Sequence, residues 1–159
     1  MRFFNLFKKH NSTQIVMIKA SLITPESFKK EAQETTNTAK EVFKAELDFT
    51  SESIKTLEKI IEEGWKTPMG ERAAREVSMS IFSLGSYLGE TIIKNLGGKW
   101  QVNTTEENPV EKMLNTKIVD LGKIAEIYPF GKTFKRFVNG KEDSLDFFYR
   151  SLERISKGG

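Results

Sequence analysis

The longest helical pattern in the chain spans residues 71–96 and ends at a pair of glycines. Gly97 and Gly98 follow the pattern directly, and glycine is common just past the end of a helix. Its apolar residues recur at helical spacing: Val77, Ile81, Leu84, Leu88 and Ile92. Because the apolar face of a helix must be buried against another element, the remainder of the fold has to supply its partners.

Two shorter helical patterns precede it. Thr24, Pro25 and Glu26 resemble a helix start, with a capping threonine and a proline at the first helical position. A weak apolar stripe follows, made of Phe28, Ala32, Thr35, Ala39, Val42 and Phe43. Residues 47–49 interrupt it, and Thr50 or Ser51 then caps a second helix that runs to residue 64. Residues 67–70 separate that helix from the long one.

The spacing of apolar residues changes from helical to alternating after Gly98. Trp100 and Val102 alternate with polar residues, the segment 117–120 is short and β-branched, and the segment 124–128 alternates again. These patterns predict two or three antiparallel strands with a turn at residues 121–122. The polar segment 103–115 is expected to be one long loop.

Two helical segments end the chain. Pro129 is expected to end the sheet, residues 132–138 to form a short helix, and Asp143 to cap a last helix that ends near residue 156. The fold class is therefore α+β, with about three helices in the amino-terminal half, a small antiparallel sheet of two to three strands and a C-terminal helix. Residues 22–157 form a single domain, and residues 1–21 form an arm.

Composition excludes several kinds of chemistry. The chain has no cysteine and a single histidine, His10, so Cys/His and Ser/His/Asp catalytic sets and Cys-ligated metal sites are excluded. Carboxylates are the only remaining candidates for acid–base catalysis, and we expect no metal and no cofactor. The net charge of +3 is spread along the chain, which does not favour nucleic-acid binding.

The first residues combine aromatic and basic side chains. Phe3, Phe4 and Phe7 stand beside Arg2, Lys8 and Lys9. We expect this arm to dock on the domain or to be disordered, and contact with a membrane surface is the alternative. The longest apolar run near it, residues 15–18, is too short for a signal peptide or a membrane span, so we expect a cytoplasmic protein.

The segment 84–90 is the most unusual part of the long helix. Gly85 and Gly89 lie four residues apart on one face, although a glycine inside a helix costs about 1 kcal/mol relative to alanine. They permit the close approach of a packing element or, alternatively, of a ligand. Tyr87 and Glu90 could share the rim of such a groove, with Glu90 as a general acid or as a partner of Lys132 or Arg136.

Two aromatic segments near the C-terminus have alternative interpretations. Residues 130–137 interleave phenylalanines with basic residues, a pattern that suits single-stranded nucleic acid. On a helix, however, Phe134, Phe137 and Val138 face the core while Lys132, Lys135 and Arg136 face solvent, and we favour this arrangement. Residues 147–149 carry more aromatic surface than one stripe buries, so part of it is expected to form a partner site.

Three stretches of the chain resemble a family of small uncharacterised bacterial proteins, loosely similar to immunity proteins. They are Leu47-Asp48-Phe49-Thr50-x-x-Ser53-Ile54, then Leu84-Gly85-x-Tyr87-Leu88-Gly89-Glu90 with Gly97-Gly98-x-Trp100, and Pro129-Phe130 with Asn139-Gly140-x-x-Asp143-Ser144-Leu145. The resemblance covers residues 45–155 and implies that Trp100 lies near Gly89 and Glu90. It implies no reaction, cofactor or substrate.

The expected function is that of a non-enzymatic protein-binding module, immunity- or stress-related, that recognises another protein through the long helix, the sheet and the last helix. The alternative is a small-molecule binder or a carboxylate-dependent enzyme. Its cleft would lie near Gly85, Gly89 and Glu90. The candidate binding residues under both hypotheses are Gly85, Tyr87, Gly89, Glu90 and Trp100.

Overall fold

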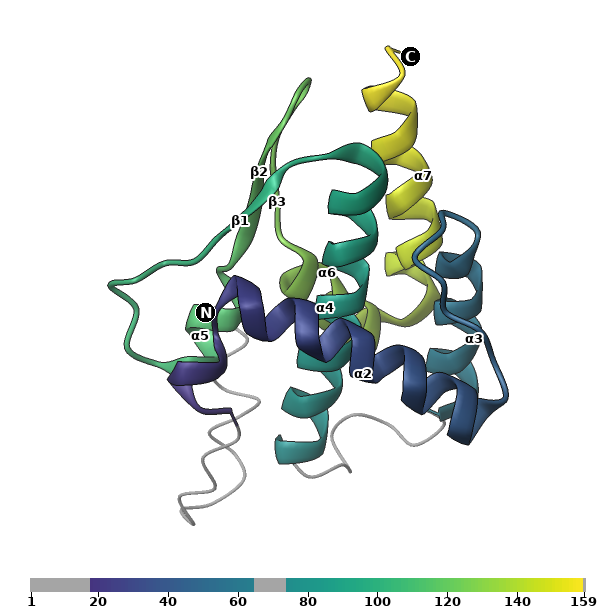
Figure 1. Cartoon of the computed structure of the whole chain (residues 1–159), viewed down its shortest axis with the longest axis horizontal. Coiled ribbons are helices and arrows are strands. Elements are labelled where there is room, and N and C mark those ends of the chain that lie inside the picture. The colour runs from purple at the N-terminus through teal and green to yellow at the C-terminus, as the bar shows by residue number, and fades with distance from the viewer. Residues whose placement is uncertain (1–17, 65–73, 159) are drawn as a thin grey trace.

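The computed structural model describes residues 18–64 and 74–158 of the chain (Figure 1). Three long helices form its first half: α2 (Pro25–Phe43), α3 (Ser53–Gly64) and α4 (Ala74–Leu96). Thr24 caps α2 by accepting a hydrogen bond from the backbone N–H of Ser27, as the sequence predicts. The expected start of the long helix at residue 71 and the separator at 67–70 lie outside the described residues.

A three-stranded antiparallel sheet follows α4. Its strands are β1 (Lys99–Gln101), β2 (Lys117–Leu121) and β3 (Ile124–Ile127), in the order β1-β2-β3. Trp100 pairs with Ile118, and Ile118 pairs with Ile127. The predicted long loop is wrong in part, because residues 109–114 form the helix α5 (Pro109–Leu114). The side chain of Asn108 caps this helix by accepting from two backbone N–H groups, and Pro109 occupies its first turn.

The chain ends with α6 (Pro129–Asn139), the 3-10 turn η3 (Gly140–Asp143) and α7 (Leu145–Ser156). Pro129 begins α6 three residues earlier than predicted, because the fixed φ of proline suits the first helical position. The predicted cap of the last helix is also wrong. Ser144, not Asp143, accepts the hydrogen bond from the backbone N–H of Phe147.

The helix α4 occupies the centre of the fold. It contacts α2, α6, α7 and β2, and Figure 1 shows α2 crossing it while the β2–β3 hairpin rises on one side and α7 on the other. Helices and sheet share one apolar core, whose largest members include Phe28, Ile54, Ile81, Phe130 and Tyr149. The predicted α+β class, with a small sheet and a C-terminal helix, is confirmed.

The chain upstream of α2 joins the same core. Ile18 is buried, and residues 20–22 form the 3-10 turn η1 (Ala20–Leu22). The last four residues of the predicted arm therefore belong to the described structure. The aromatic and basic residues 2–9 lie outside it.

Candidate functional site

The face of α4 that carries Gly85 and Gly89, here called the glycine face, is covered by aromatic rings. A Cβ atom at Gly89 would lie 2.0 Å from Cη2 of Trp100, and one at Gly85 would lie 2.5 Å from Cδ1 of Phe130. The rings of Trp100 and Phe130 stack on each other with centroids 5.5 Å apart, and Phe28 contacts both rings. The two glycines thus make room for side chains of the same protein.

Glu90 lies beside this aromatic cluster. The indole N–H of Trp100 donates a hydrogen bond to Oε1 of Glu90 at 2.7 Å, and both residues are half-buried. The left-handed backbone at Gly97 and Gly98 carries the chain from the end of α4 into β1, so that Trp100 lies against the helix that precedes it. The expected proximity of Trp100 to Gly89 and Glu90 is observed.

The predicted ion pairing of Glu90 with Lys132 or Arg136 is wrong, because each cation pairs elsewhere. Lys132 lies 2.6 Å from a carboxylate oxygen of Asp143 and holds the pKa of that carboxyl below its usual range. Arg136 pairs with Glu58 of α3 at 2.9 Å. Arg136 was also expected to face solvent, but it is only 5% exposed, because its charge is matched by that carboxylate.

Val138 departs from the predicted pattern of α6 in the opposite direction. It was expected to face the core with Phe134 and Phe137, which are buried, but it is 43% exposed. It lies in the last turn of α6, next to Asn139, where the helix ends. The core of α6 therefore closes at Phe137, one residue before the predicted stripe ends.

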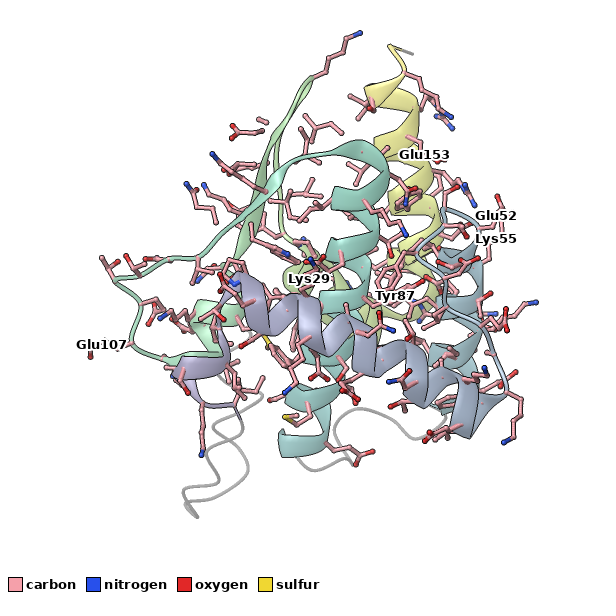
Figure 2. All side chains as sticks on the ribbon, viewed as in Figure 1. Lys29, Glu52, Lys55, Tyr87, Glu107 and Glu153 are labelled. Carbon is pink, nitrogen blue, oxygen red and sulfur yellow. The ribbon has the colours of Figure 1, made fainter. Side chains whose placement is uncertain are left out.

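The side chain of Tyr87 points toward the connection between α2 and α3. It is fully buried, its hydroxyl lies 2.6 Å from Oγ of Ser53, and it accepts a hydrogen bond from the backbone N–H of Phe49 at 2.9 Å. Burial raises its pKa. Figure 2 shows Tyr87 on the side of α4 that faces α3. Since Glu90 contacts Trp100 and Tyr87 contacts the α2–α3 connection, the two groups do not form the shared rim that their spacing suggests.

The connection between α2 and α3 is held by α4. Phe49 has a φ of +60°, an unusual value for an aromatic residue, and its ring stacks on Tyr87 with centroids 4.8 Å apart. The side-chain amide of Asn95 donates to the carbonyl oxygen of Phe49 at 2.8 Å. These contacts hold the α2–α3 connection, which contains the motif at residues 47–54, against α4. They give the candidate residue Tyr87 a structural role.

One open cavity among the described residues lies elsewhere, on the other side of α4. We call it the α2–α4 cleft. It has a volume of about 310 Å³ and lies between the second half of α2, the end of α3 and the first half of α4. Its lining is mainly apolar and includes Ala39, Phe43, Leu47, Ile60, Ile61, Met79 and Leu84.

The charged residues of the α2–α4 cleft are all acidic. Glu31, Glu34 and Glu76 line it, and no lysine, arginine or histidine does so within the part of the chain that the structure describes. Glu31 accepts a hydrogen bond from Oγ of Ser83 at 2.5 Å, which links α2 to α4 at one end of the cleft. Glu34 is exposed. The described lining of the cleft thus combines an apolar interior with acidic residues.

Sequence reasoning missed this cleft. The only signal was the weak stripe of α2, in which Thr35 and Ala39 stand where larger apolar residues would fill the space. Thr35 donates to the carbonyl oxygen of Ser83 at 3.2 Å, so small side chains meet where α2 crosses α4. The stripe shows that small side chains of α2 face the core, but it does not show which helices enclose the space.

Other surface features are less concentrated. Phe147 is 72% exposed on α7, whereas Tyr149 is buried, so the aromatic segment 147–149 is indeed partly exposed.

Among the residues that the structure describes, no group of three histidine, cysteine, aspartate or glutamate residues could hold a metal ion. Within the same ranges, no helix is both long and apolar enough to cross a membrane.

Comparison with known proteins adds no relative. No protein-family model, no curated protein and no solved structure matches the chain. The resemblance to small bacterial proteins of the immunity type therefore stays a prediction from the sequence.

Proposed function

We propose that the protein is a non-enzymatic protein-binding module and that a partner protein inserts apolar side chains into the α2–α4 cleft. The observation that carries this proposal is the cleft itself, an apolar cavity of about 310 Å³ whose charged lining residues, among those that the structure describes, are acidic. Open apolar surface of this kind, rimmed by polar groups, is typical of interaction sites. The proposal keeps the class of function expected from the sequence and moves the binding surface to α2, α3 and α4.

The alternative, a small-molecule binder or carboxylate-dependent enzyme near Gly85, Gly89 and Glu90, has less support. A ligand over the glycine face would have to displace Trp100 or Phe130, whose rings fill that space. Glu90 already accepts the indole hydrogen bond, and the hydroxyl of Tyr87 is engaged by Ser53 and Phe49. Glu90, the candidate general acid, is thus already engaged in a hydrogen bond that holds Trp100 against α4.

The biological setting is part of the same proposal. A bacterial, immunity- or stress-related role rests on the resemblance of residues 45–155, and a cytoplasmic location rests on the shortness of the apolar run at residues 15–18. Neither depends on the cleft, and the cleft can be tested without them.

Site-specific cross-linking tests the proposal. A photoreactive amino acid replaces Thr38, an exposed residue that lines the cleft, and in a second protein it replaces Ile155, which is 43% exposed on α7. In cells of the native host, we expect a defined protein to be captured at position 38 and not at position 155. Met79→Lys, at a cleft residue that is 37% exposed, should abolish the capture.

Capture of no protein at position 38, or equal capture at both positions, would contradict the proposed function. The melting temperature of the Met79→Lys variant is measured in parallel, so that a loss of capture is attributed to the cleft only when the protein remains folded.

A further inference from the structure

We propose that the Asn139–Gly140 pair is a site of spontaneous deamidation, which the fold holds closed and which reacts when the end of α6 opens. No other asparagine of the chain is followed by glycine. Because glycine has no side chain to shield its main-chain nitrogen, this pair loses the side-chain amide more readily than other asparagine pairs. Residues 139–145, here called the α6–α7 junction, connect the two last helices and are separate from the α2–α4 cleft.

The reaction needs only the chain and water. The main-chain nitrogen of Gly140 forms a bond to Cγ of Asn139, the Cγ–Nδ2 bond breaks, and the departing nitrogen takes the proton of the N–H group and leaves as ammonia. A succinimide ring remains. Water then adds to one of the ring carbonyls and opens the ring, which leaves aspartate or isoaspartate at position 139. In isoaspartate the main chain passes through Cβ and Cγ and is therefore longer.

In the folded chain the reacting groups are held away from this path. The N–H of Gly140 donates to the carbonyl oxygen of Arg136 in the last turn of α6, and Asn139 keeps a near-helical backbone with a ψ of −8°. The side-chain amide of Asn139 donates to Oδ2 of Asp143 at 2.6 Å, while Lys132 holds Oδ1 of the same carboxylate at 2.6 Å. Both hydrogen bonds of the pair must break before the ring can close.

The α6–α7 junction lies where opening is local. Asn139 is the last residue of α6, and it is exposed together with Val138. The ends of helices open at a much lower free energy than the core does. Phe137 and Arg136, the next residues inward, are buried. The reactive state therefore requires the last turn of α6 to open, but it does not require the core to unfold.

The products cannot restore the closed junction. An ionised aspartate only accepts hydrogen bonds, so a carboxylate at position 139 would face that of Asp143 where an amide now donates. A negative charge in the last turn of α6 also opposes the helix dipole. The junction ends at Leu145, whose N–H donates to Glu58 of α3. Deamidation thus weakens the junction irreversibly, at the point where α7 is attached to α3.

Peptide mapping of the full chain measures the reaction. The protein is kept in mildly alkaline buffer, folded or in denaturant, and the tryptic peptide 137–141 is followed by mass spectrometry. In the folded chain, we expect position 139 to react faster than Asn103, which is exposed and precedes threonine. It should react at least about tenfold more slowly than in denaturant, because a closed segment reacts only from its open fraction. Equal rates in folded and denatured chains, or no excess over Asn103, would overturn the proposal.

The urea dependence separates local from global opening. Urea concentrations too low to unfold the protein should leave the rate at Asn139 nearly unchanged, because opening one turn exposes little surface. A rate that climbs in parallel with global unfolding would contradict the local opening of α6.

A variant of the carboxylate tests the hydrogen bond that holds the pair. Asp143→Ala should speed deamidation at Asn139 about two- to tenfold, the range expected for the loss of one hydrogen bond. Glu126→Ala is the matched control, because it removes a carboxylate that pairs with Lys117 in the sheet, and it should leave the rate unchanged. Melting temperatures confirm that both variants are folded. An unchanged rate in Asp143→Ala would show that this contact does not close the site.

A substitution that imitates one product tests the consequence. Asn139→Asp should lower the melting temperature by about 2–4 °C. The exchanged variant Asn139→Asp/Asp143→Asn again places an amide opposite a carboxylate and should recover most of this loss. A melting temperature of Asn139→Asp equal to that of the native chain would overturn the claim that deamidation weakens the junction.

Discussion

The two sides of α4 differ in how the space beside the helix is filled. On the glycine face, Trp100 and Phe130 occupy the room that Gly85 and Gly89 leave, and the packing is closed. On the side of α2, small residues again leave room, but a cleft of about 310 Å³ stays open among the described residues. The comparison teaches that small residues in a helix predict that another group can come close to the helix, but they do not identify that group.

The difference arises from what the chain brings to each side. The turn at Gly97 and Gly98 returns β1 along α4, and the start of α6 at Pro129 places Phe130 against Gly85. Both rings thus come from elements that follow α4. On the other side, Thr35 contacts α4 at the point where the helices cross, and the small side chain of Ala39 and the end of α3 line the space that stays open beyond that point.

The largest expected effect is on the closed side. Gly89→Leu should lower the free energy of unfolding by about 3 kcal/mol or more, because even a Cβ atom there meets the ring of Trp100 and overpacking forces the surroundings to shift. Chemical denaturation measures this. The matched control is Gly131→Ala in α6, where a Cβ atom would have ordinary contacts and stability should rise by up to about 1 kcal/mol. Similar stability of the two variants would break the comparison.

A smaller loss is expected when the hydroxyl of Tyr87 is removed. Tyr87→Phe leaves the backbone N–H of Phe49 and the hydroxyl of Ser53 without this partner, at a cost of about 1–3 kcal/mol. Tyr128→Phe, which removes an exposed hydroxyl bonded to Glu126, should change stability by less than about 0.5 kcal/mol. Equal effects, measured by denaturation, would mean that α4 does not hold the α2–α3 connection as described.

The open side should tolerate substitution. Met79→Lys places a long cationic side chain at the margin of the cleft, where it can extend into solvent, so the melting temperature should change little and stability by about 0.5 kcal/mol or less. A loss above about 1 kcal/mol would show that the cleft contributes to the packed core, and the contrast between the two sides of α4 would fail.

The smallest effect at neutral pH is expected at Tyr149. Its hydroxyl is buried near the side-chain amide of Asn95, which already donates to the carbonyl oxygens of Phe49 and Thr91, so Tyr149→Phe should be nearly neutral in stability at pH 7. Burial raises the pKa of Tyr149 from 10.0 to about 12. A raised pKa in the folded state means that its contribution is present below pH 10 and is lost as the pH rises toward 12.

The pH dependence of stability distinguishes the native chain from the Tyr149→Phe variant. The native chain should lose stability between pH 10 and 12 more steeply than Tyr149→Phe, as followed by thermal melts across that range. Parallel profiles would show that the phenol titrates normally and that this part of the closed interior admits solvent.

Much of the fold was predictable because its signals are local. The stripe from Val77 to Ile92, the cap at Thr24 and the turn at Gly97 each depend on residues within a few positions of one another. Short elements were harder to predict. The six-residue helix α5 lies in a polar segment, and only the cap at Asn108 with Pro109 signals it.

The candidate site was predicted only in part. The sequence identified Gly85 and Gly89 as positions of close approach, and it associated Trp100 with Glu90 through a resemblance, but it could not say that rings of the same chain would occupy the space. The direction of Tyr87 and the burial of Arg136 depend on Ser53 and Glu58, which lie 34 and 78 residues away along the chain.

By itself, the sequence determined the fold class, most helices and strands, and the absence of cysteine chemistry, because periodicity, caps and composition act over short stretches of chain. Only the tertiary structure decided that the glycine face is closed and that an acidic, apolar cleft lies between α2, α3 and α4. The physical reason is that a cavity is the space left between elements. It therefore depends on how Glu31, Ile61 and Met79, which are distant in the chain, are brought together.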